Sequence, residues 1–311
     1  MAGVLLFSSP EDDPLRWSRA LLALAPALEI RVSPALGNPA EIEVALVWKP
    51  PAGELSRLSN LRLVISLGAG VDRLLEDPEF PPGIPIVRLG EAGMAETMNL
   101  YVAHAVLRHH REIVRFETAQ RERRWDFALP RPAQESRIGV MGLGTLGGAA
   151  ARFLASLGFR VAGWSRSPKS IPGVSCCHGA DALPPFLAGS DILVVLLPLT
   201  PETRGLLGRD LLYRLPRGAK LVSCGRGPTI VEEDLVEALN SGQIAEATLD
   251  VFATEPLPAD HPFWGMEQVL MTPHVASFAI PEIAARDVVE NIRRLHAGEP
   301  LLHLVERDRG Y

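Results

Sequence analysis

The sequence predicts an α/β protein of two doubly wound domains with parallel sheets, the second inserted into a discontinuous first. Short apolar runs alternate with helical patterns along the chain, which is typical of parallel sheets covered on both faces. A chain of 311 residues is long enough for two domains. A glycine-rich turn at residues 142–147 lies in the middle of the chain, so the long stretch before it needs a fold of its own.

The first domain is predicted from short strands and one capped helix. Its strands are expected at Val4–Phe7, Val44–Val47, Leu63–Leu67 and Ile86–Arg88. Asp13 before Pro14 marks the start of a helix that we expect to end near Leu28. A last helix over 281–297 is expected to return to this domain. The predicted boundaries are 1–98 and 280–311 for the first domain and 99–279 for the second.

The second domain is predicted from a longer βα series. A long helix is expected over 96–116, and a basic irregular segment over 121–131 follows it. A helix over 231–241 is closed by Gly242. The strands after the glycine turn are expected at Arg160–Trp164, Ile192–Leu197, Leu221–Ser223, Ala247–Asp250 and Val269–Met271.

The glycine turn has the spacing G-x-G-x-x-G at Gly142, Gly144 and Gly147, between an apolar run and an alanine-rich helical run. The first glycine permits a sharp turn, the second lets a pyrophosphate approach the backbone, and the third lets the helix pack close to the strand. The helix N-terminus then offers N–H groups to phosphates. This motif predicts a Rossmann-like dinucleotide-binding domain, although a tight turn without a ligand has the same pattern.

The residues after the second strand of this domain indicate which nucleotide binds. An NAD-type site has Asp or Glu about 20 residues after the glycines. This chain has Ser165, Arg166, Ser167 and Lys169 there, with no acid before Asp181. Hydroxyls and cations suit a 2′-phosphate, so we expect NADP(H) to be preferred, with NAD(H) possible. A solvated basic turn is the alternative interpretation.

Polar residues follow three later strands, at the edge where α/β sheets place ligands. They are Arg226, Glu255 and His274. Each alone also fits a structural role, as a surface ion pair, the start of a turn or a hydrogen-bonded histidine. Together, and behind a nucleotide motif, they form a candidate catalytic set.

These motifs resemble those of the D-isomer-specific 2-hydroxyacid dehydrogenases over nearly the whole chain, and most of all the glyoxylate/hydroxypyruvate reductase branch. One departure is Ser223, where the family often has Asn three residues before the arginine. The segments that carry the resemblance are 47–51, 66–72, 91–94, the glycine turn, 164–167, 197–200, 250–256 and 272–274.

The resemblance implies a role for each candidate residue. Arg226 binds the 2-keto acid, His274 protonates its keto oxygen, and Glu255 orients the imidazole. Asp250 holds the nicotinamide carboxamide. The implied substrate contacts are Trp48, Leu67, Gly68, Ala69, Gly70, Met94, Arg226 and His274, with a flavodoxin-like first domain as the substrate domain. The implied cofactor contacts are Gly142, Gly144, Thr145, Leu146, Gly147, Trp164, Ser165, Arg166, Ser167, Lys169, Leu197, Pro198, Thr203, Cys224, Gly225 and Asp250, and no metal site is expected.

The resemblance implies NADPH-dependent reduction of small 2-keto acids, such as glyoxylate and hydroxypyruvate, by a homodimer. The alternatives are an NAD-linked dehydrogenase with another substrate and a nucleotide-sensing corepressor-like binding protein. A net charge of −6 and a pI near 5.8 give no indication of a nucleic-acid or membrane partner. Three cysteines without a disulfide framework, and a start without a signal-peptide pattern, favour the cytoplasm.

Overall fold

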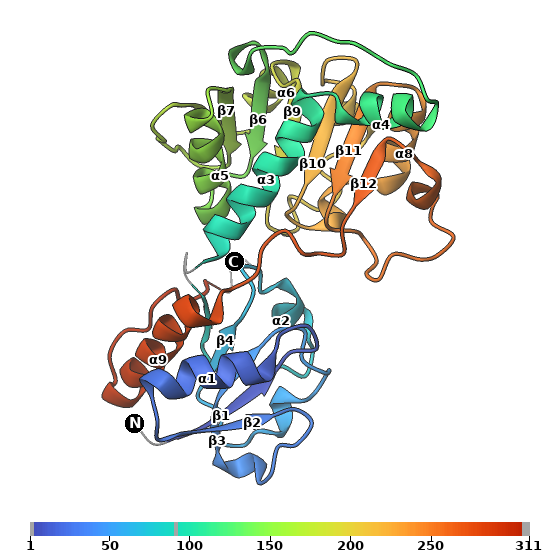
Figure 1. The fold of residues 1–311 in the computed structure, drawn as a ribbon. Coiled ribbons are helices and arrows are strands. Elements are labelled where there is room, and N and C mark those ends of the chain that lie inside the picture. Colours follow the sequence, from blue (N-terminus) through green and yellow to red (C-terminus); the bar gives the residue numbers. More distant parts are fainter. Residues whose placement is uncertain (1–2, 90–92, 307–311) are drawn as a thin grey trace. The chain divides into compact units, whose positions relative to one another are not determined.

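The computed structural model describes residues 3–89 and 93–306, which form two compact units. Unit 1 comprises Met1–Met94 and Phe278–Tyr311, and unit 2 comprises Ala95–Ser277. Figure 1 shows both units as parallel sheets with helices packed on them. The predicted α/β class with parallel sheets is confirmed.

Unit 1 has a five-stranded parallel sheet in the order β2-β1-β3-β4-β5. Helix α1 is capped by the Asp13 side chain, which accepts from the Leu15 N–H, and it packs against α9. The elements are β1 (Gly3–Ser8), α1 (Pro14–Leu24), β2 (Leu28–Val32), β3 (Ile42–Val47), β4 (Leu63–Ser66), α2 (Asp72–Glu76), β5 (Ile86–Arg88) and α9 (Pro281–Ala297), with single 3₁₀ turns at Pro39–Glu41 and Leu55–Arg57.

In unit 1, one expected helix end was wrong in detail and one strand was missed. Helix α1 ends at Leu24 and not near Leu28, because Ala25 precedes Pro26, and a residue before proline disfavours the helical conformation. Strand β2 was not predicted. It is an edge strand that is buried only at Leu28, so it lacks the continuous apolar pattern of the central strands.

The predicted helix over 96–116 is two helices, α3 (Met94–His110) and α4 (Ile113–Arg121). Glu112 breaks it with a left-handed φ of 54°. The turn is held by paired hydrogen bonds from Arg108 to the Glu117 carboxylate, at 2.7 and 2.6 Å. Neither glycine nor proline marks the break, so the sequence pattern does not reveal it.

Unit 2 has a seven-stranded parallel sheet in the order β12-β11-β10-β9-β6-β7-β8. Strand β8 was not predicted, because this edge strand is only half-buried and carries Ser175, Cys176 and Cys177. The elements are β6 (Arg137–Met141), α5 (Thr145–Ser156), β7 (Arg160–Ser165), β8 (Val174–His178), α6 (Leu183–Ala188), β9 (Ile192–Val195), α7 (Arg209–Leu212), β10 (Ala219–Ser223), α8 (Glu232–Asn240), β11 (Ile244–Leu249) and β12 (Val269–Met271), with 3₁₀ turns at Ala133–Glu135, Gly227–Thr229 and Pro262–Gly265.

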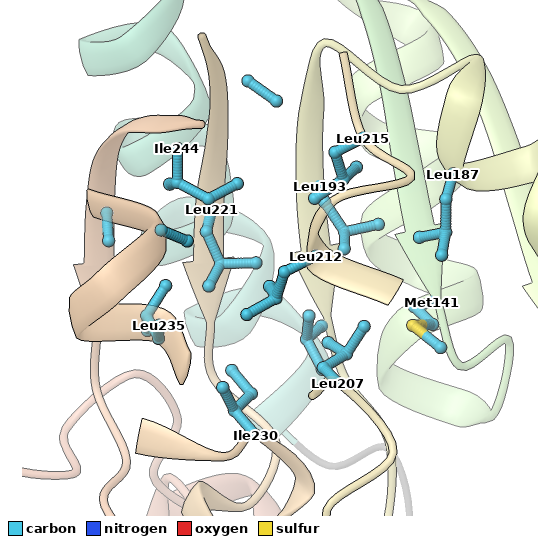
Figure 2. Close-up of a cluster of buried hydrophobic side chains, with 14 of the residues drawn as sticks. Met141, Leu187, Leu193, Leu207, Leu212, Leu215, Leu221, Ile230, Leu235 and Ile244 are labelled. Carbon is cyan, nitrogen blue, oxygen red and sulfur yellow. The ribbon is translucent and has the colours of Figure 1, made fainter. Parts of the chain in front are cut away.

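Two apolar layers cover this sheet, one on each face. Leu193 and Leu221 belong to the layer under α6, α7 and α8, part of which is drawn in Figure 2. Val194 and Val222, one residue further along the same strands, belong to the layer under α3 and α5. Alternation of side chains across a strand explains why both faces need apolar residues, and burial of each contributes about 1.5–3 kcal/mol. This rigid sheet fixes where its strand ends place polar side chains.

Within the part of the chain that the structure describes, no helix has the length and apolar character needed to cross a membrane.

Candidate active site

The glycine turn joins β6 to α5 in a closely packed βα corner. Gly142 has a φ of 101°, and Gly144 is the N-cap of α5, which opens with Thr145 and Leu146. A Cβ at Gly147 would lie 1.8 Å from the Gly142 carbonyl oxygen, so only glycine lets the helix approach this closely. The first turn of α5 therefore presents its N–H groups beside the turn, an arrangement that suits a pyrophosphate.

The turn after β7 places two serines and two cations at the same edge of the sheet. Trp164 is buried, and its Nε1 donates to the Gly179 carbonyl at 2.8 Å. The Ser165 hydroxyl donates to the Ser167 carbonyl at 2.8 Å, while Arg166 and Lys169 are exposed. A hydrogen bond with Thr200 lowers the pKa of Glu202, and the Arg166 charge lowers it further. The turn therefore has positive charges near the surface and no carboxylate of its own.

The other predicted cofactor residues of unit 2 follow β9 and β10 at this edge. Thr203 donates to the Pro198 carbonyl at 2.7 Å and accepts from the Thr200 N–H at 2.8 Å, which closes the loop that begins at Leu197. Cys224 is buried and Gly225 half-buried directly after β10. Arg226 follows, half-buried, with its Nη1 donating to the Gly225 carbonyl at 3.0 Å.

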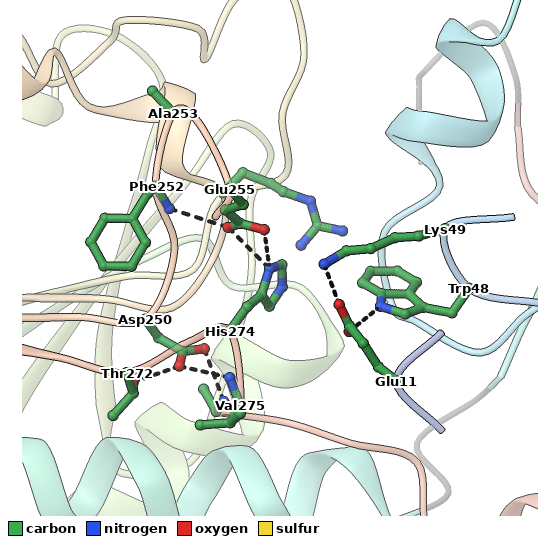
Figure 3. A network of polar contacts seen from close by, with 12 residues as sticks. Glu11, Trp48, Lys49, Asp250, Phe252, Ala253, Glu255, Thr272, His274 and Val275 are labelled. Carbon is green, nitrogen blue, oxygen red and sulfur yellow. Dashed lines mark hydrogen bonds and ion pairs between the residues drawn. The ribbon is translucent and has the colours of Figure 1, made fainter. Parts of the chain in front are cut away.

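His274 and Glu255 form a close pair. The imidazole Nδ1 lies 2.9 and 3.1 Å from the two Glu255 carboxylate oxygens (Figure 3). The Phe252 N–H also donates to Glu255, at 3.2 Å. Because a carboxylate only accepts hydrogen bonds, the contact between His274 and Glu255 makes Nδ1 the donor, and Nε2 points away from the carboxylate.

Asp250 anchors the loop that carries His274. Its side chain is fully buried and accepts from the Thr272 hydroxyl at 2.6 Å and from the N–H groups of Val275 and Ala276 at 2.8 and 2.9 Å. Burial raises the pKa of this carboxyl, against those hydrogen bonds. The carboxylate therefore holds the loop, and the contact with the nicotinamide carboxamide that the resemblance implies stays a prediction.

Sequence reasoning missed the support of this loop. The hydroxyl of Tyr101, in α3, lies 2.5 Å from that of Thr272, so Asp250 is connected to a helix far away in the sequence. Burial raises the pKa of Tyr101, which keeps it a neutral donor. No local pattern reveals such a contact, because Tyr101 lies on a helix without any motif.

The predicted substrate residues outside unit 2 lie in unit 1. Leu67 is buried after β4, and the loop over 68–70 is half-buried. The Ser66 hydroxyl contacts the carbonyls of Gly68 and Gly70 at 3.0 and 3.3 Å, a support that the sequence analysis did not single out. Met94 is buried at the start of α3. Glu91 and Ala92, of the segment 91–94, lie outside the described residues.

Residues 103–276 match the model of the D-isomer specific 2-hydroxyacid dehydrogenase NAD-binding domain. The chain belongs to this dehydrogenase family. It is 39% identical to glyoxylate/hydroxypyruvate reductase A of Yersinia enterocolitica, over 99% of each chain. The predicted resemblance to this branch is confirmed.

Two solved structures of the family are similar to this chain over almost its full length. A 2-hydroxyacid dehydrogenase of Xanthobacter autotrophicus Py2, in complex with NADPH and MES, is 54% identical over 100% of both chains, with a TM-score of 0.95. An NADPH-dependent glyoxylate/hydroxypyruvate reductase of Sinorhizobium meliloti, in complex with NADP and sulfate, is 36% identical over 99% of this chain and 100% of that one, with a TM-score of 0.93.

Proposed function

We propose that this dehydrogenase reduces small 2-keto acids, such as glyoxylate and hydroxypyruvate, to 2-hydroxy acids with NADPH, and that His274 is the proton donor. The observation that carries the proposal is the His274–Glu255 pair, with Nδ1 2.9 Å from the carboxylate, on the sheet that also carries the glycine turn. A histidine whose Nδ1 is held by a carboxylate in this way is typical of a general acid with a fixed ring orientation.

In the proposed reaction, residues of unit 2 supply the proton and bind the substrate carboxylate. NADPH supplies the hydride, which adds to the keto carbon. His274 gives the Nε2 proton to the keto oxygen, so the C=O bond becomes C–O–H and the imidazole is left neutral until it takes a proton from solvent. Glu255 orients the imidazole through Nδ1, and the Arg226 guanidinium pairs with the substrate carboxylate and polarises the keto oxygen.

The preference for NADPH is supported by the Trp164–Lys169 turn. Arg166 is exposed where the adenosine ribose is expected, and the turn lacks the acid that would bind ribose hydroxyls. The X. autotrophicus and S. meliloti relatives were solved with NADPH and NADP. The close βα corner at Gly147 fits a pyrophosphate.

For substrate binding, we propose that backbone N–H groups of the loop over 68–70 hold the substrate carboxylate. The Ser66 hydroxyl contacts two carbonyls of this loop and supports its conformation. Trp48 and Met94 are proposed to line the substrate site and limit the size of the substrate that it accepts.

Steady-state kinetics with a substrate panel test the proposal. Glyoxylate, hydroxypyruvate and pyruvate are each compared with NADPH and with NADH at one ionic strength. We expect NADPH-dependent reduction of the first two. Tight NADPH binding without turnover of any 2-keto acid would favour a nucleotide-sensing binding protein and contradict the proposed reaction.

We also propose a homodimer, with the segment over 124–130 in the interface. Trp125, Phe127 and Leu129 are 97%, 76% and 81% exposed at alternate positions of this segment, which has no regular secondary structure. Asp126 between them is fixed by Arg115, at 2.6 and 2.8 Å. Large apolar side chains exposed together mark an interaction surface, and a second copy is the partner that family resemblance implies.

Light scattering at micromolar concentration tests the dimer. The wild type is expected to have the mass of two chains, and a variant with serine at Trp125, Phe127 and Leu129 to have the mass of one. A monomeric wild type contradicts the proposal.

We further propose a cytoplasmic location. The thiols of Cys176, Cys177 and Cys224 form no disulfide, as is usual in a reducing compartment.

A further inference from the structure

A polar network in unit 1 lies next to the proposed carboxylate site. One Glu11 carboxylate oxygen accepts from Trp48 Nε1 at 2.8 Å, and the other accepts from Lys49 Nζ at 2.7 Å (Figure 3). The same ammonium lies 5.6 Å from the centroid of the Trp48 ring. A single carboxylate thus holds an indole and a cation at the carboxyl end of β3.

This network is held in place by its surroundings. The Ser9 hydroxyl donates to Asp12 at 2.7 Å, and the buried Trp17 donates to the same carboxylate at 3.4 Å, which fixes the loop that carries Glu11. Lys49 has a left-handed φ of 48°. Non-glycine residues keep such a conformation when the surrounding structure requires it, and they cluster at functional sites.

Trp48 connects the network to the loop over 68–70. A Cβ placed on Gly68 would lie 2.1 Å from Cζ3 of the Trp48 ring, so the ring packs directly on the glycine backbone. The Glu11–Lys49 pair therefore borders the loop that we propose holds the substrate carboxylate.

We propose that Glu11 and Lys49 form a charge-balanced specificity element, which favours 2-keto acids with an uncharged substituent beside the keto group over those with a second carboxylate. This inference rests on the proposed function. Lys49 alone would attract a second carboxylate, and the Glu11 charge at 2.7 Å offsets that attraction. Binding of a 2-keto acid whose substituent is hydrogen or hydroxymethyl does not depend on this charge balance, because these substituents are uncharged.

Charge-neutralising variants test the element. Glu11→Gln keeps the size and an acceptor for Trp48 but removes the negative charge. We expect the ratio of kcat/KM for oxaloacetate to that for glyoxylate to rise about fivefold. Lys49→Met should lower the ratio, and the double variant should return it toward the wild-type value. Glu41→Gln is the matched control, because Glu41 pairs with Arg31 just before the other end of β3.

A binding measurement separates this inference from the proposed function. Oxaloacetate and glyoxylate are titrated onto the NADP⁺ complex, in which no reduction occurs, and the ratio of their dissociation constants is expected to shift in favour of oxaloacetate in Glu11→Gln. If the ratio of dissociation constants shifts but the wild type does not turn over any 2-keto acid, the proposed function is overturned and the specificity element is not. Unchanged ratios in Glu11→Gln and Lys49→Met, or wild-type binding of neither acid, would overturn the specificity element.

Discussion

Two histidine–glutamate pairs in unit 2 share one geometry but differ in their surroundings. His274 and His109 each have Nδ1 2.9 Å from a carboxylate oxygen, of Glu255 and Glu246 respectively. The His109 side chain is 1% exposed, whereas that of His274 is 21% exposed. His109 Nε2 lies 3.0 Å from the Thr248 hydroxyl, inside the fold.

The two pairs differ in burial, so the same histidine–carboxylate contact occurs both inside the fold and at a half-buried position. Burial lowers the pKa of His109 in spite of Glu246, so this imidazole stays neutral and acts as a structural connector between α3 and β11. His274 stands on the loop after β12, where we propose that its ring meets the substrate. Under the proposed function, burial of the side chain, and not the carboxylate contact, separates a structural histidine from the proposed proton donor.

The sharpest test of this comparison replaces each histidine. His274→Ala is expected to lower kcat by about 10²–10⁴-fold while NADPH still binds, because the imidazole acts on the substrate oxygen. His109→Gln, which keeps hydrogen-bonding groups, should keep most of the turnover. Stopped-flow turnover and fluorescence titration of NADPH measure both effects. Equal losses in the two variants would contradict the assignment.

Replacing the two carboxylates sharpens the comparison further. Glu255→Gln removes the carboxylate that holds the imidazole Nδ1, so kcat should fall about 10–100-fold in a steady-state assay. Glu246→Gln should leave kcat near the wild-type value and change only stability. An unchanged kcat in Glu255→Gln would show that Glu255 does not act on the proposed acid.

An exposed charge provides a contrast with both pairs. Arg166→Ala should lower kcat/KM for NADPH about tenfold or more and leave that for NADH nearly unchanged, because a charge-assisted hydrogen bond contributes about 1.5–3 kcal/mol. Ser165→Asp should shift the preference toward NADH. The Arg166 effect should shrink in high salt, unlike those at His274. Equal loss with both cofactors would place Arg166 away from the 2′-phosphate.

The smallest effect concerns the pH dependence of stability. The pKa of His109 is lowered in the folded chain, so the unfolded chain takes up a proton first as pH falls below 6.5. The contribution of neutral His109 is complete above that pH and is lost progressively below it, with a slope of at most about 1.4 kcal/mol per pH unit. Urea unfolding between pH 7.5 and 5 should show a smaller slope in His109→Gln. An identical slope would mean that His109 is not the titrating group.

The sequence by itself determined the features that depend on local chemistry. Continuous apolar strands and the Gly142–Gly147 spacing predicted two parallel α/β units and the βα corner, because strand period and glycine sterics are local properties. The order of Arg226, Glu255 and His274 after successive strands predicted a shared edge, since parallel strands end on the same side of a sheet.

Only the tertiary structure decided what depends on contacts between distant residues. The break at Glu112 and the edge strands β2 and β8 lack a local pattern, because neighbouring elements stabilise them. The loop support by Asp250 and Tyr101, and the burial that separates His109 from His274, join residues far apart in the chain. Burial and hydrogen-bond partners set the chemistry of an ionisable group, and both are properties of the folded chain.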